Sequence, residues 1–136
     1  MQRAGAAAAD WASELASQRN RPILVLAGPG NNGGDAFEAA HLLQQRFFDV
    51  RLVFAGDPAS LPRDAMAACS RFREAGGIIL DGIPGDTRWS LIIDGLFGIG
   101  LTRAPEGCYA EWIATANELA KNQRVPLLAL DCPSGL

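Results

Sequence analysis

Short apolar runs alternate along this chain with longer stretches in which apolar residues recur at helical spacing. The runs are almost wholly apolar, which is typical of strands covered on both faces: residues 23–27, 50–55, 78–80, 89–94 and 125–130. The helical spacing predicts helices over residues 1–18, 34–47, 62–75 and 106–121. Strands alternating with helices predict an α/β fold, in which helices cover both faces of a mainly parallel sheet in a three-layer, Rossmann-like arrangement.

The first helix carries an apolar face made of Ala7, Trp11 and Leu15. We expect this face to pack on the sheet or on a second copy of the chain, so a homodimer is one expectation. The next helix has its own apolar stripe, which we expect to lie in the core: Ala36, Ala40, Leu43 and Phe47.

Length and composition limit the kind of protein this is. With 136 residues the chain predicts a single domain, residues 1–136. A net charge of −3, with both signs spread along the sequence, argues against nucleic acid as a partner. No apolar run reaches the ~20 residues of a membrane span. Cys69, Cys108 and Cys132 form no CxxC pair, which favours reduced thiols in the cytoplasm.

Three of the predicted strands are followed by loops that carry an aspartate at or just beyond the strand end. These residues are Asp35, Asp94 and Asp131. Because parallel strands end at the same edge of a sheet, the three loops are expected to converge on one crevice, where open α/β sheets bind ligands. Purely structural roles stay open at this point: Asp35 as a cap of the following helix, and Asp94 as an acceptor for neighbouring backbone N–H groups.

The glycine-rich segment 28–35 lies between a predicted strand and a predicted helix, where backbone can approach a ligand closely. It is not a phosphate-binding P-loop, since no Gly-Lys-Ser/Thr follows. Gly28, Gly30 and Gly33 have the GxGxxG spacing of a dinucleotide fingerprint, and Asp57 follows the second strand roughly where a ribose-binding acid is expected. The fingerprint alone is a weak signal.

A more specific signal comes from three motifs in order. Asn-Asn-Gly-Gly-Asp begins at Asn31, Asp-Gly-Leu-Phe-Gly-Ile-Gly-Leu-Thr-Arg begins at Asp94, and Asp-Cys-Pro-Ser-Gly-Leu begins at Asp131. Together they resemble the NAD(P)H-hydrate epimerase family (YjeF N-terminal domain), and the resemblance runs from the Met-x-x-Ala-Gly opening at Met1 to Leu136. It implies an isomerase that interconverts the R and S forms of hydrated NADH and NADPH (NADHX and NADPHX) in nicotinamide nucleotide repair.

The family's site residues can be carried onto matching positions. The first motif implies substrate contacts from Asn31, Asn32, Gly33, Gly34 and Asp35. The second implies phosphate contacts from Gly98, Ile99, Gly100, Leu101, Thr102, Arg103 and Ala104. Asp131 is implied as a further substrate contact.

A potassium ion is also implied by the resemblance, held by Asn32, Asp94 and Ser134. The chemistry of these side chains agrees, because a hard monovalent cation takes amide, carboxylate and hydroxyl oxygens. The implied inversion needs an acid–base group beside the hydrated carbon. We expect Asp131 to be that group, with Asp35 as the second candidate.

The chain departs from the family in two ways. Ala36 stands where glycine usually follows Asn-Asn-Gly-Gly-Asp; alanine would weaken binding if this position needs a positive φ, and would help if it is helical. The family domain also continues beyond the last motif, so we expect a fragment, truncated at its C-terminus, whose own activity is open. An ADP- or ATP-dependent dehydratase domain is often fused to this one. The alternative function is a catalytically inactive nucleotide-binding or protein-interaction module, which would be expected to lose the aspartates and the Asn pair.

Overall fold

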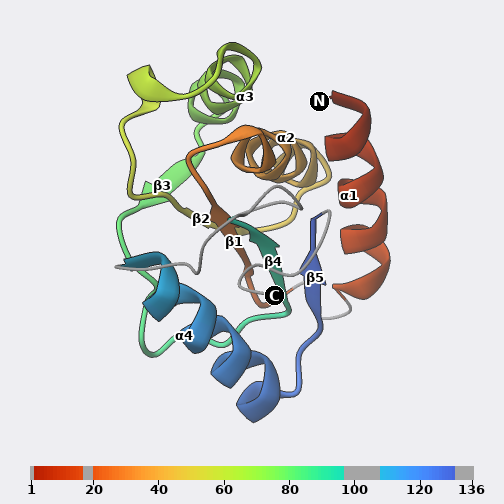
Figure 1. Cartoon of the computed structure of the whole chain (residues 1–136). Coiled ribbons are helices and arrows are strands. Elements are labelled where there is room, and N and C mark those ends of the chain that lie inside the picture. Colours follow the sequence, from red (N-terminus) through yellow and green to blue (C-terminus); the bar gives the residue numbers. More distant parts are fainter. Residues whose placement is uncertain (1, 17–19, 97–107, 131–136) are drawn as a thin grey trace.

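A parallel β-sheet forms the middle layer of the molecule (Figure 1). The computed structural model describes residues 2–16, 20–96 and 108–130. Within them the sheet has five strands: β1 (Ile23–Ala27), β2 (Val50–Val53), β3 (Ile78–Leu80), β4 (Leu91–Gly95) and β5 (Leu127–Ala129). Their order across the sheet is β3-β2-β1-β4-β5, and every neighbouring pair is parallel. The predicted α/β fold is confirmed.

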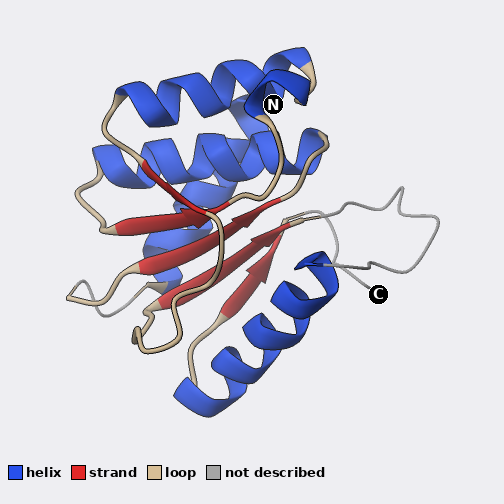
Figure 2. Cartoon of the chain, turned by 90° about the vertical axis from the view of Figure 1, so that its left-hand side faces the viewer, coloured by secondary structure: helices blue, strands red, loops and turns tan. Residues whose placement is uncertain are grey.

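Helices cover both faces of this sheet (Figure 2). They are α1 (Gln2–Leu15), α2 (Asn31–Gln45), the 3-10 helix η1 (Pro58–Ser60), α3 (Arg63–Glu74) and α4 (Cys108–Gln123). The helices α1, α2 and α3 lie on one face and α4 lies on the other. This is the three-layer arrangement predicted from apolar strand segments that alternate with amphipathic helices.

The central strand β1 shows why the strand sequences are apolar throughout. Ile23 and Val25 belong to the core beneath α1, α2 and α3, while Leu24 and Leu26 belong to the core beneath α4. Successive side chains of a strand point to opposite faces, and here both faces are covered by helices. Every residue of β1 is therefore buried.

The packing face of α1 differs from the prediction. Ala7 is exposed and Trp11 is 61% exposed, whereas Leu15 is half-buried. Small residues form the buried face instead: Gly5, Ala8, Ala9, Ala12 and Ala16. They let α1 approach α2 closely, since a Cβ built on Gly5 would lie 2.5 Å from Cγ of Glu38. A tryptophan is too large for such a contact, so it lies outside it.

The end of α2 also differs from the predicted stripe. Ala36, Ala40 and Leu43 are buried as expected, but Phe47 is 91% exposed. The helix ends at Gln45, and Phe47 has a φ of 67°, which turns the chain toward β2. Phe48 enters the core in its place.

Candidate functional site

The carboxyl ends of the strands share one edge of the sheet, toward which all the arrowheads point in Figure 2. The predicted site residues after β1 and at the end of β4 are described by the structure: Asn31, Asn32, Gly33, Gly34, Asp35 and Asp94. The remaining predicted site residues lie outside the described residues: Gly98, Ile99, Gly100, Leu101, Thr102, Arg103, Ala104, Asp131 and Ser134.

Helix α2 begins three residues earlier than predicted. Its first residue is Asn31, and Gly30 is the N-cap with φ −104° and ψ −159°. The Asn-Asn-Gly-Gly-Asp motif therefore forms the start of a helix and not a loop before one. Asp35 is the fifth helical residue, so the interpretation of Asp35 as an N-terminal cap is wrong.

Two glycines of segment 28–35 are required by close backbone packing. A Cβ on Gly28 would lie 1.8 Å from the carbonyl oxygen of Leu96, and a Cβ on Gly33 would lie 1.9 Å from the carbonyl oxygen of Gly28. The Gly28 N–H also donates to the carbonyl of Gly95, at 3.0 Å. These contacts hold the start of α2 against the chain that leaves β4. They account for two glycines of the formal GxGxxG spacing without a dinucleotide.

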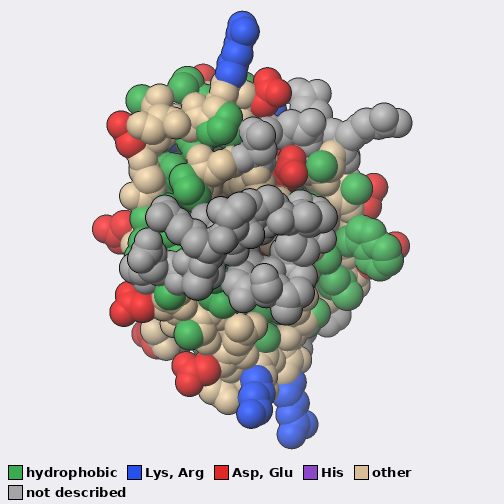
Figure 3. Space-filling model, in the orientation of Figure 1, with side chains coloured by type: hydrophobic (Ala, Val, Ile, Leu, Met, Phe, Trp, Pro, Cys, Tyr) green, Lys and Arg blue, Asp and Glu red, His purple; other side chains and the backbone are tan. Residues whose placement is uncertain are grey.

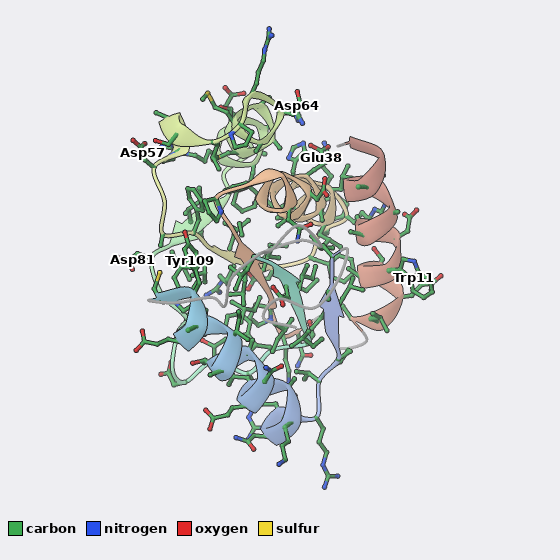
Figure 4. All side chains as sticks on the ribbon, viewed as in Figure 1. Trp11, Glu38, Asp57, Asp64, Asp81 and Tyr109 are labelled. Carbon is green, nitrogen blue, oxygen red and sulfur yellow. The ribbon has the colours of Figure 1, made fainter. Side chains whose placement is uncertain are left out.

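Asp57, the formal ribose-binding acid, has a local structural role. It is exposed (Figure 4), and its carboxylate accepts a hydrogen bond from the backbone N–H of Ala59 at 3.0 Å, which caps η1. Such an N-cap satisfies a donor that the helix leaves unpaired. The structure thus explains this aspartate without the dinucleotide interpretation.

Asp94 is buried near the end of β4, with 6% of its surface exposed. Its Oδ1 accepts a hydrogen bond from the backbone N–H of Leu96, at 3.1 Å. The structural interpretation of Asp94, as an acceptor for neighbouring backbone N–H groups, is confirmed. This hydrogen bond uses one of the two carboxylate oxygens.

Leu130 joins Asn32 and Asp94, although sequence reasoning gave it no role. Its N–H donates to the carbonyl of Asp94 at 2.9 Å. Its own carbonyl accepts a hydrogen bond from Nδ2 of Asn32 at 3.2 Å, across 98 positions of sequence. The structure thus brings two predicted site residues to the same point. The sequence signal for Leu130 was only that it precedes Asp131.

A cavity of about 620 Å³ adjoins this point, between α1 and β5. Asn32 and Asp35 contribute its polar lining, one turn apart on α2. The rest of the lining comes from α1 and from the chain around β5: Ala4, Ala8, Trp11, Leu15, Leu128, Ala129 and Leu130. Figure 3 shows hydrophobic side chains gathered on the α1 side of the molecule. The cavity therefore combines a polar end at the motif with apolar walls.

Ala36 fits its position because residue 95 is glycine. It is a buried residue inside α2, and the described non-glycine residues with positive φ are Phe47 and Arg124. A Cβ built on Gly95 would lie 2.7 Å from Cβ of Ala36. The alternative in which position 36 is helical is confirmed, and alanine favours the helix there.

Comparison with known proteins decides the family. The model of the family described as YjeF-related protein N-terminus matches residues 1–136. The chain belongs to this family. It is 48% identical to a protein of Bordetella pertussis (strain Tohama I) named NAD(P)H-hydrate epimerase, over all of this chain and 57% of that protein. A protein of the same name from Achromobacter xylosoxidans is 45% identical, over 98% of this chain and 62% of that protein.

The family fold is also seen in a solved structure. The crystal structure of yeast ynu0, YNL200c, superimposes with a TM-score of 0.81 at 18% identity, over 99% of this chain and 60% of that chain. The chain thus spans about three fifths of the length of each of these three proteins. The family predicted from three motifs is the one found, and the sheet edge described above is its site candidate.

Two further features, a membrane-spanning helix and a metal-binding cluster of His, Cys, Asp and Glu, are absent from the residues that the structure describes. No helix in residues 2–16, 20–96 and 108–130 is long and apolar enough to cross a bilayer. Within the same ranges, His, Cys, Asp and Glu side chains do not gather in groups of three or more that could hold a metal ion.

Proposed function

We propose that this chain is the catalytic domain of an NAD(P)H-hydrate epimerase, an isomerase that interconverts the R and S forms of hydrated NADH and NADPH. The observation that carries the proposal is the junction at Leu130, which joins Asn32 of the first motif to Asp94 of the second. The relatives named NAD(P)H-hydrate epimerase, at 45–48% identity, support the same function. An inactive module would be expected to lose Asn32 and Asp94, and this chain has both.

The substrate nucleotide is proposed to bind across the carboxyl edge of the sheet. The start of α2, from Asn31 to Asp35, would contact the hydrated nicotinamide end. The segment from Gly98 to Ala104 would contact phosphate, because Thr102 and Arg103 supply hydrogen-bond donors and glycines allow backbone approach. The packing of Gly28 on Leu96, just before this segment, supports the proposal that the two segments act together.

A potassium ion is proposed as the cofactor, with Asn32, Asp94 and Ser134 as its ligands. The described side chains fit a hard cation. Because Nδ2 of Asn32 donates to Leu130, the oxygen of this amide is directed away from that carbonyl and is the atom suited to a cation. Asp94 adds a buried carboxylate. When bound, the ion would supply a fixed positive charge beside the nucleotide.

Inversion is proposed to proceed by loss and return of the hydroxyl group. The carboxyl group of Asp131 would protonate the hydroxyl on the hydrated carbon, the C–O bond would break, and water would leave. The lone pair of the adjacent ring nitrogen would stabilise the resulting cation. Water would then add to either face and return a proton to the carboxylate of Asp131. Asp35, half-buried in the cavity lining, is the second candidate for this group.

The cellular setting is proposed on the same basis. A protein of Leishmania braziliensis named Bifunctional NAD(P)H-hydrate repair enzyme is 37% identical to this chain, which covers 24% of it. We infer that this epimerase works with an ADP- or ATP-dependent dehydratase, fused or separate, in nucleotide repair. Free thiols at Cys69 and Cys108 support a cytoplasmic location. A homodimer remains a proposal, with α1 as its surface.

The test is chromatographic separation of the two forms after pure R-NADHX is incubated with the chain in potassium buffer. The proposal predicts that the chain equilibrates R and S, and that Asp131→Asn slows this by roughly 100-fold or more. Asp57→Asn is the matched control, because this exposed aspartate only caps η1, and it should keep the wild-type rate. A folded chain that binds the nucleotide but leaves R unchanged would favour the inactive module.

A further inference from the structure

Leu130 is held on three sides, at the point where the chain leaves β5. Its N–H donates to Asp94, its carbonyl accepts from Asn32, and its side chain is buried in the core with 7% of the residue exposed. The strand itself is short and half-buried, and in the described residues it pairs with β4 alone. The backbone of Leu130 is therefore held from two directions: by β4 through its N–H, and by the side chain of Asn32, outside the sheet, through its carbonyl.

The direction of this hydrogen bond has a chemical consequence. A carbonyl only accepts, so the Asn32 group that faces Leu130 must be the NH₂ donor and not the oxygen. If residue 32 acted only as a cation ligand, aspartate would suit this position at least as well as asparagine, because aspartate carries a full negative charge. Asparagine, unlike aspartate, offers a donor to Leu130 and an oxygen to a cation at the same time.

We infer that Asn32 is a positioning residue for the catalytic aspartate: its side-chain NH₂ group holds the Leu130 carbonyl and thereby fixes the strand exit from which Asp131 follows. This inference rests on the proposed function. It links the first turn of α2, which meets the substrate, to the residue that moves the proton. This connection affects catalysis because a small displacement of an acid–base group lowers the reaction rate by a large factor.

The test is Asn32→Asp, which keeps a ligand oxygen and removes the donor. Asn117→Asp adds the same charge at an exposed position of α4 and is the matched control. Three quantities are measured: kcat and KM for R-to-S conversion, the potassium concentration that gives half-maximal thermal stabilisation, and deuterium exchange in the peptide spanning residues 127–131.

For Asn32→Asp we expect kcat to fall by about tenfold or more, with KM within about threefold, because the part-buried hydrogen bond to Leu130 is lost. Exchange in the β5 peptide should rise several-fold, while the potassium requirement should not increase. Asn117→Asp should match the wild type in all three. If Asn32 only stabilised the fold, Asn32→Asp would lower the melting temperature without lowering kcat more than it changes KM.

Other results would overturn the inference. If Asn32→Asp keeps the wild-type kcat and deuterium exchange in the β5 peptide is unchanged, the hydrogen bond to Leu130 does not position Asp131. If the potassium requirement rises while β5 stays protected, Asn32 acts only as a ligand. Should Asn32→Asp not fold, Asn32→Leu removes the donor without adding charge, and the same exchange measurement decides. If the wild type does not epimerise, the proposed function fails, and exchange alone still tests the hydrogen bond.

Discussion

The three glycines of the GxGxxG spacing differ in what surrounds them. Gly28 and Gly33 have backbone oxygens within 2 Å of a built Cβ, whereas Gly30 has nothing within 4 Å and a φ of −104°. We predict that Gly28→Ala and Gly33→Ala each lower the free energy of unfolding by about 3 kcal/mol or more, since backbone cannot rotate away. At Gly33 this cost exceeds the gain of about 1 kcal/mol in helix propensity.

Urea denaturation followed by circular dichroism measures these changes, with Gly30→Ala as the control. Gly30→Ala should cost less than about 1 kcal/mol, the usual difference between glycine and alanine at an N-cap. Equal losses at all three positions would contradict the close packing of Gly28 on Leu96. They would also reopen a ligand-contact role for these glycines.

Cys69 makes stability depend on pH in alkaline solution. Burial raises the pKa of its thiol above the ordinary value of 9.0, partly opposed by the charge of Arg73. A raised pKa means that the folded state holds the proton more tightly than the unfolded state. The stabilisation is therefore complete below pH 9.0 and is lost as pH rises through the folded-state pKa.

The prediction is checked by urea unfolding at several values between pH 8 and pH 11. The wild type should lose stability more steeply above pH 9 than Cys69→Ala does. The comparison isolates the thiol, because burial also raises the pKa of Tyr109 and that effect is common to both proteins. Parallel curves for the two proteins would show that Cys69 is not a buried thiol.

At the scale of elements, α2 and α3 are joined by an ion pair whose carboxylate is buried. Nη2 of Arg71 lies 2.6 Å from Oε2 of Glu38; the glutamate side chain is 7% exposed and that of the arginine 35%. Figure 4 labels Glu38 on α2. We predict that Arg71→Met lowers the free energy of unfolding by about 1–3 kcal/mol, because it leaves a buried carboxylate without its partner. Adding Glu38→Gln should recover part of this loss.

The exposed pair of Arg51 and Asp49, at 3.0 Å, provides the control. Arg51→Met should change the free energy of unfolding by less than about 1 kcal/mol, as is usual for a surface pair. Thermal and urea unfolding of both variants measure the difference. A smaller effect at Arg71 than at Arg51 would contradict the burial of the α2–α3 pair.

Strand and helix identities followed from local pattern, but helix faces and ends did not. The runs at residues 23–27 and 78–80 are strands with the predicted bounds. The face of α1 was misjudged because periodicity favours the largest apolar residue, whereas the contact with α2 needs small ones. The start of α2 was misjudged because glycines read as a loop. Gly33 and Gly34 are instead helical, and at Gly33 the packing of backbone excludes any side chain.

At the scale of the whole molecule, parallel strands made the site predictable in outline. The sheet brings Asn32 and Asp94 to the backbone of Leu130 at one edge, as expected from strand ends that share a direction. Leu130 itself could not be predicted, because its role is that of a backbone carbonyl and no side-chain pattern encodes it. Asp131 and Ser134 lie outside the described residues, so their part in the site stays a prediction.

The most direct test of the central claim is incubation of pure R-NADHX with the chain in water enriched in oxygen-18, followed by chromatography and mass spectrometry of both forms. Loss and return of the hydroxyl predicts that S-NADHX appears and carries the heavy oxygen, and that Asp131→Asn suppresses both signals. R-NADHX that stays unconverted, with the folded chain and potassium present, would contradict the account.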